Sequence, residues 1–416
     1  MTRTSLPSNQ PTPELRSALP GAMLFFGGAL TVVGLAASLI RNSGTEFFLA
    51  WLLAFMFYYS LCLGALFMVM VHHLTDAGWS VGIRRFCEHL ASLLRLPLIV
   101  MFLPIGLFGP KIYHWMTLLG DPSNNLVAAK QPVFTIHGFW ITSAIFFAVW
   151  WLLTSRLCSL SLQQDETGAA ECTRKMRFHS GWGMVAFALT LTFSAVLWMQ
   201  AVQYQWFSAI YGVYFFASSV WAALAVIYVI SVALLRQDIL KPVLKPNYFY
   251  FIGVLLLAFT LLSSYAEFAQ YFVVWNANMP EETFWYLIRE NGGWWWLSML
   301  LILGKFFVPF FALLPIHTKT NFKVLIPVCL LIGVMHFADL AFNILPGSRA
   351  GGHHVKWLFL HLGCVLLMGG ILARIFVKKF NSHPPYPRRD PRLLEAMGVN
   401  PHLVNDFVDA NAGGAK

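Results

Sequence analysis

The chain has 416 residues, of which 58% are hydrophobic and 11% are charged, and its mean hydropathy is +0.65. An ordinary soluble domain carries about 25% charged residues, so this composition excludes a soluble globular protein. The net charge of +10 does not indicate a nucleic-acid partner. The basic residues lie in loops between apolar segments, where they set the orientation of the chain and contact anionic membrane lipid.

Uncharged apolar segments of 18 or more residues recur along the chain, and each can cross a hydrocarbon core of about 30 Å. We therefore predict an all-α polytopic membrane protein. Ten transmembrane helices are predicted, at residues 21–40, 47–72, 90–109, 132–155, 180–201, 208–235, 248–275, 294–316, 324–345 and 355–377.

The predicted organisation is an N-terminal extension (1–20), a transmembrane domain (21–377) and a basic, proline-rich tail (378–416) that follows the membrane surface. Residues 1–20 lack the apolar core of a signal peptide, so we expect the first helix to be retained.

Counting Lys and Arg on each side of the membrane predicts the orientation. The two ends of the chain and the even-numbered loops hold 19 of these residues, and the odd-numbered loops hold 6. Both termini are therefore predicted to be cytoplasmic, which agrees with an even number of helices. The acidic loop 276–292 then faces the periplasm.

The stretch 263–296 carries the most informative polar residues. Glu267 lies in an apolar helix and shares a helical face with Ser264 and Tyr271. A carboxylate within a membrane helix is costly unless it faces protein, water or a partner. Three interpretations remain open: a glutamate that only holds helices together, a proton-relay or quinol-related residue, and a residue closer to the membrane interface.

His336 and Asp339 are three residues apart on the ninth predicted helix. Pairing of the carboxylate with the imidazole would suit a proton relay, whereas a hydrogen-bonded pair that only holds the ninth helix to a neighbour would be structural. Lys305 in the eighth helix must find an anionic partner or lose its proton in so apolar a segment. Glu267 or Asp339 is the natural partner, and such a pair would place the seventh, eighth and ninth helices in one bundle.

Further ionisable residues lie in other predicted helices. At 1.5 Å per residue, His361 in helix ten and His137 in helix four lie in the same periplasmic half as Glu267 and Asp339. The cytoplasmic half offers chiefly Arg95, whose side chain can reach the interface. This asymmetry favours a polar network near the periplasmic face, with Tyr271 at its edge.

Several kinds of site are not indicated. Single histidines on different helices do not supply the facing pairs that bis-histidine haem requires. The six cysteines form no CxxC motif, so neither zinc nor an iron–sulfur cluster is predicted. No nucleotide-binding or hydrolase motif has a convincing context, and we expect neither a catalytic centre nor a cofactor in this chain.

Three stretches resemble a known family: Tyr265–Glu267–Phe268–Gln270–Tyr271 with Trp275–Asn276–Ala277–Asn278 and Pro280–Tyr286; Leu103–Pro104 through Gly109 with Lys111 and Tyr113–Trp115; and Pro309 through Pro315. They are similar to the F subunits of bacterial alternative complex III, which are NrfD-like (polysulfide-reductase-like) membrane subunits of quinol:cytochrome c oxidoreductases. The resemblance covers most of residues 20–380.

This resemblance implies ten transmembrane helices, in which helices two to five and six to nine form two four-helix bundles beside two peripheral helices. It implies a location in the bacterial inner membrane. It also implies partners: multihaem and monohaem cytochrome c subunits, an iron–sulfur subunit and a second NrfD-like subunit. The haem c and iron–sulfur clusters would belong to those partners, and this chain would hold no cofactor of its own beyond a quinone or lipid at its surface.

The leading hypothesis is a membrane subunit of a respiratory quinol:cytochrome c oxidoreductase that supports proton transfer. The proton-pathway candidates are the ionisable side chains named above: Glu267, Lys305, His336, Asp339, His361, His137, Arg95 and Tyr271. Two alternatives are a purely structural subunit that docks cytochromes through loop 276–292 and a secondary transporter that works alone. Against the transporter, the two halves lack matching helices broken by glycine or proline.

Overall fold

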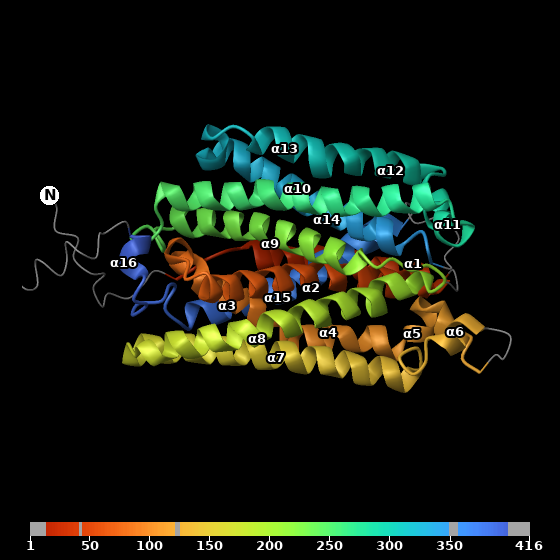
Figure 1. The fold of residues 1–416 in the computed structure, drawn as a ribbon, viewed down its shortest axis with the longest axis horizontal. Coiled ribbons are helices and arrows are strands. Elements are labelled where there is room, and N and C mark those ends of the chain that lie inside the picture. The colour runs from red at the N-terminus through yellow and green to blue at the C-terminus, as the bar shows by residue number, and fades with distance from the viewer. Residues whose placement is uncertain (1–13, 41–43, 121–124, 349–356, 398–416) are drawn as a thin grey trace, which may run out of the picture.

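The computed structural model describes residues 14–40, 44–120, 125–348 and 357–397. All regular elements in these ranges are helices, so the predicted all-α fold is confirmed (Figure 1). The predicted extension 1–20 and tail 378–416 lie partly outside the described residues. What is described of them begins at Glu14 and ends at Met397.

Ten helical segments in the described ranges are long and apolar enough to cross a membrane. They are Leu19–Ile40 (α1), Thr45–Leu74 (α2), Gly78–Leu107 (η1, α3, η2 and α4), Ile136–Thr167 (α7), Ala170–Gln203 (α8, η4 and η5), Tyr211–Arg236 (α9), Pro246–Ala277 (α10), Gly293–Leu313 (α12, η6 and α13), Phe322–Ile344 (α14) and Leu358–Asn381 (α15).

Several of these segments are composite, and short helices connect others. The parts of the composite segments are η1 Gly78–Ser80, α3 Val81–Ala91, η2 Ser92–Leu94, α4 Leu96–Leu107, α8 Ala170–Ser194, η4 Ala195–Met199, η5 Gln200–Gln203, α12 Gly293–Leu301, η6 Ile302–Phe307 and α13 Val308–Leu313. The short connecting helices are α5 Gly109–Ile112, η3 His114–Thr117, α6 Asn125–Ala129, α11 Pro280–Arg289, η7 His317–Thr320 and α16 Leu393–Ala396.

The transmembrane segments form two groups of four and one peripheral pair. The first group contains α2, α3–α4, α7 and α8, and the second contains α9, α10, α12–α13 and α14. Helices α1 and α15 pack along each other and lie against α2. Helices α5, α6 and α11 lie at one end of the long axis, and α3 and α16 lie toward the other (Figure 1). We call these the α11 end and the α16 end.

Small residues allow the helices to approach closely where the groups meet. A Cβ atom added at Gly64 of α2 would lie 2.4 Å from the Cβ of Ala223 and 2.6 Å from the carbonyl oxygen of Ser219, both on α9. In the peripheral pair, a Cβ at Gly27 of α1 would lie 2.3 Å from the backbone nitrogen of Leu367 on α15. Close packing of this kind is how membrane helices associate without a hydrophobic driving force between them.

The structure corrects several predicted boundaries. The third segment begins at Gly78 instead of residue 90, because the polar residues of α3 are buried by protein and not exposed in a loop. Helices α7 and α8 extend through the predicted loop 156–179 to a turn at Gly168, whose φ of +70° suits glycine. Loop 276–292 contains α11, so it is not only a connection.

Candidate functional site

A buried lysine joins three helices of the second group. Lys305 lies in η6, and its Nζ atom is 2.8 Å from Asp339 Oδ2 on α14 and 3.1 Å from Glu267 Oε2 on α10. The prediction that Lys305 pairs with one of these carboxylates is confirmed for both of them, and the three helices lie in one bundle as expected. We call the three residues the lysine triad.

The local backbone explains why Lys305 reaches α14. Segment η6 is π-helical, and such wide turns within helices occur often at functional sites. A Cβ atom at the neighbouring Gly304 would lie 2.4 Å from the sulfur of Met335, so the Met335 side chain packs directly over this glycine and η6 lies close to α14. The approach brings the lysine ammonium onto the carboxylate of Asp339.

Hydrogen bonds from α9 extend the lysine triad. Tyr214 donates from its hydroxyl to Asp339 Oδ1 at 2.5 Å, and its ring centroid lies 4.8 Å from the nitrogen of Lys305. Asn343 donates from Nδ2 to the Tyr214 hydroxyl at 2.8 Å, and Tyr211 donates to Asn343 Oδ1 at 3.3 Å. All of these polar atoms have partners, as a buried network requires.

Arg289 at the end of α11 joins this network and was not predicted to do so. Its side chain is fully buried, and it donates to the carbonyl oxygens of Phe342 at 2.9 Å and Asn343 at 3.0 Å. These carbonyls belong to the last turn of α14, where carbonyl groups have no N–H donor further along the helix. The guanidinium also lies 3.4 Å from the ring centroid of Trp285. Burial lowers the pKa of Arg289 to about 9, so it stays protonated at neutral pH.

The two carboxylates of the lysine triad are not equivalent. The Asp339 side chain is 1% exposed and also accepts the hydrogen bond from Tyr214, so its ionised form is well stabilised. The Glu267 side chain is 36% exposed and has the longer contact with Lys305. Lys305 can neutralise only one of them. With Arg289 included, the site is neutral when both are ionised and gains one positive charge when Glu267 is protonated.

His336 does not form the predicted pair with Asp339. Its Nε2 atom lies 2.7 Å from the hydroxyl of Ser60 on α2, and its Nδ1 atom has no hydrogen-bonding partner among the described residues. Asp339 is instead oriented by Lys305 and Tyr214. His336 thus connects α14 with α2 by itself, without the pair with Asp339 that both interpretations from the sequence assumed.

The other candidates lie apart from the lysine triad. His137 is exposed in the first turn of α7, and Tyr271 is 43% exposed on α10, where its ring contacts Tyr286. His361 is buried on α15, a helix that packs against α1 and α2. Arg95 precedes α4 toward the α16 end. Counting residues along each helix predicted which half of the bundle several of these residues lie in. It could not predict which side of each helix faces the other helices.

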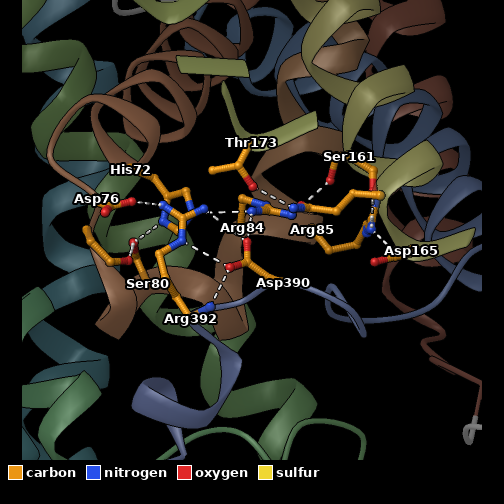
Figure 2. Close-up of polar contacts among 12 residues, drawn as sticks. His72, Asp76, Ser80, Arg84, Arg85, Ser161, Asp165, Thr173, Asp390 and Arg392 are labelled. Carbon is orange, nitrogen blue, oxygen red and sulfur yellow. Dashed lines mark hydrogen bonds and ion pairs between the residues drawn. The ribbon is translucent and has the colours of Figure 1, made fainter. Parts of the chain in front are cut away.

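A second buried network lies near the α16 end, and the sequence analysis missed it (Figure 2). Arg84 and Arg85 of α3 are each at most 1% exposed. Both arginines form ion pairs with Glu88, Arg84 at 3.1 Å and Arg85 at 3.2 Å. Arg84 also pairs with Asp390 of the tail, and Arg85 pairs with Asp165 of α7. We call these five residues the arginine cluster.

The arginine cluster fixes the described part of the tail to the bundle. Arg392 contacts both carboxylate oxygens of Asp390 at 3.0 Å, and its Nη1 atom donates to Asp76 at 2.9 Å. Burial raises the pKa of Asp390, but the charge of Arg84 and the hydrogen bonds from Arg392 outweigh burial and hold the pKa at about 2. The spacing of Arg84 and Glu88, four residues apart, was the available signal for a helix here.

An apolar stretch of α2 separates the two networks. Ser60 contacts His336 near the lysine triad, and His72 contacts Arg84 of the arginine cluster. Between Ser60 and His72 every residue of α2 is apolar, over about 18 Å at 1.5 Å per residue. In the described residues, the polar contacts along α2 therefore fall into two separate regions.

Within the described ranges, no group of three His, Cys, Asp or Glu side chains could hold a metal ion. Compared with known proteins, the sequence matches no protein-family profile, and no curated protein is detectably similar to it. The two buried networks are therefore the features from which a function can be argued.

Proposed function

We propose that this chain is a membrane subunit of a respiratory quinol:cytochrome c oxidoreductase and that its lysine triad takes up and releases a proton. The respiratory assignment rests on the resemblance of residues 265–286 to alternative complex III subunits. On this proposal the haem and iron–sulfur cofactors belong to partner subunits in the bacterial inner membrane.

The proton role rests on one observation, a buried lysine that lies between two carboxylates from different helices. Ionisable groups within membrane segments are rare and commonly mark ion or proton pathways. Glu267 is the group that exchanges the proton, because its contact with Lys305 is longer than that of Asp339 and Asp339 also accepts a hydrogen bond from Tyr214. Tyr214 and Asn343 continue the hydrogen-bonded chain toward the α11 end. Because α2 is apolar beyond Ser60, the proposed exchange is confined to the α11 half.

The test uses the assembled complex in vesicles, with quinol oxidation and proton release measured together. Glu267→Gln should slow proton-coupled turnover at least about tenfold, since a positioned proton-transfer group contributes about a hundredfold or more. The exposed Glu281 of α11 provides a matched control, and Glu281→Gln should leave both rates unchanged. Unchanged proton release in Glu267→Gln would leave the triad with a structural role only.

A second candidate function is anchoring of partner subunits through α11. Met279, Leu287 and Ile288 are 49%, 48% and 39% exposed at this end of the bundle. Replacing Leu287 and Ile288 with Ser should reduce recovery of cytochrome partners with the chain, whereas turnover of the complex that still assembles should not change. Full recovery of the partners would exclude α11 as their anchor.

A further inference from the structure

A cavity of about 250 Å³ lies beside the arginine cluster, between the start of α4, the middle of α7 and the last turn of α15. Its walls include the basic side chains of Arg85, Arg95, Lys379, His89 and His383. Neither the lysine triad nor the proton exchange proposed for Glu267 involves it.

Several groups on the cavity wall lack a counter-ion or a hydrogen-bonding partner. His89 is 2% exposed, and neither of its ring nitrogens has a hydrogen-bonding partner among the described residues. Arg95 and Lys379 are half-buried, and neither forms an ion pair with a carboxylate in the part of the chain that is described. Lys379 does donate a hydrogen bond to the hydroxyl of Ser92 at 2.6 Å, but this neutral partner leaves its charge uncompensated. Glu88, which also lines the cavity, is already paired with two arginines. Buried polar groups are nearly always satisfied, so this wall indicates an anionic ligand.

A separate apolar groove of about 510 Å³ lies near the cavity, along α4 and α7. Ile99, Ala148 and Leu152 are among its lining residues. Arg95 precedes Ile99 by four residues, and Ser155 of the cavity follows Leu152 by three, so the two spaces are about one helical turn apart. A cationic cavity with an apolar groove about one helical turn away on a transmembrane surface has the two chemical parts of a lipid site.

We propose that this face binds an anionic phospholipid, with its phosphate in the cavity and an acyl chain in the groove. Arg95 and Lys379 neutralise the phosphate, and His89 donates a hydrogen bond to it. Basic pockets between transmembrane helices are suited to such headgroups, and the free anion alone would leave the groove unused.

The full-length protein, purified and delipidated, can be titrated with phosphatidylglycerol while bound lipid is counted by native mass spectrometry. The variant Arg95→Gln/Lys379→Gln should weaken retention at least about tenfold, since each basic side chain near an anionic headgroup contributes measurably. The matched control is Arg156→Gln/Lys378→Gln, which removes the same charge from exposed positions on α7 and α15 and should bind normally. Ala148→Phe should block the groove and weaken retention without removing charge.

Phosphatidylcholine, whose headgroup has no net charge, should bind more weakly than phosphatidylglycerol. Equal retention of both lipids, or no difference between the two double variants, would overturn the proposal. If inorganic phosphate displaced the lipid and Ala148→Phe still bound phosphatidylglycerol normally, the cavity would be a site for a free anion. That result would also overturn the proposal.

Discussion

Replacing Asp339 with Asn tests whether the lysine triad holds the second bundle together. Asp339 accepts hydrogen bonds from Lys305 at 2.8 Å and from Tyr214 at 2.5 Å, and the side chains of Asp339 and Lys305 are each 1% exposed. Removing one member of a buried ion pair costs about 3–5 kcal/mol. Glu267 still contacts Lys305 at 3.1 Å, so we expect a loss near the lower end, about 3 kcal/mol.

The assay is unfolding in mixed micelles of increasing denaturing detergent, followed by tryptophan fluorescence. Lys305→Met should also destabilise the protein, since it leaves two carboxylates without their cation. The double variant Lys305→Met/Asp339→Asn should lose less than the sum of the two single losses, by about 2 kcal/mol. This non-additivity is the specific signature of a buried pair.

A matched cycle on an exposed pair provides the control. Lys175 and Glu171 of α8 are 2.9 Å apart, with side chains 54% and 57% exposed. Their double-mutant cycle should show losses that add, because an exposed ion pair is screened by solvent and contributes little. If the Lys305 and Asp339 losses were additive, or as small as those of this control, the reasoning about the lysine triad would be refuted.

Three other predictions concern the arginine cluster and α11. Asp390→Asn should destabilise the fold by about 3 kcal/mol, because it removes the carboxylate that pairs with the buried Arg84. The control is Asp238→Asn, in an exposed pair with Lys241, which should cost less than about 1 kcal/mol in the same unfolding assay. The pKa of Asp390 is about 2, below its value of about 3.9 in the unfolded chain, so its contribution to the free energy of unfolding is complete above pH 4 and is lost as the pH falls toward 2. A spin label at Pro391→Cys should therefore become mobile only as the pH falls from 4 toward 2. Release of the tail near pH 6 would contradict this. Arg289→Lys should cost about 2 kcal/mol because lysine cannot reproduce the forked donation to the end of α14, whereas Arg236→Lys at an exposed position should be neutral.

The apolar segments predicted the membrane class, all ten segments and most boundaries to within a few residues, because a hydrocarbon core constrains helix length and composition strongly. They could also predict that Lys305 needs a carboxylate, since an unpaired ammonium is so costly there. Both Glu267 and Asp339 were identified as partners from their depth. Which of the two is exposed depends on the rotation of α10 and α14, and helical spacing alone does not determine this.

The failures have a common physical reason. Arg84, Arg85 and Glu88 were assigned to a loop because charge normally indicates exposure, yet protein from α7 and the tail buries them. Arg289 was counted as a loop residue on the same basis, although it satisfies carbonyl groups of α14. Buried charges with distant partners such as Asp390 cannot be recognised from local sequence, because the partner is about 300 residues away in the chain.

Proton exchange at Glu267 can be measured most directly by infrared spectroscopy of the full-length protein in lipid as the pH is varied. The account predicts a carboxyl C=O stretching band that appears as the pH falls, that disappears in Glu267→Gln and that persists in the control Glu281→Gln. A titrating band that is unchanged in Glu267→Gln, or the absence of any such band in the unmodified protein, would contradict it.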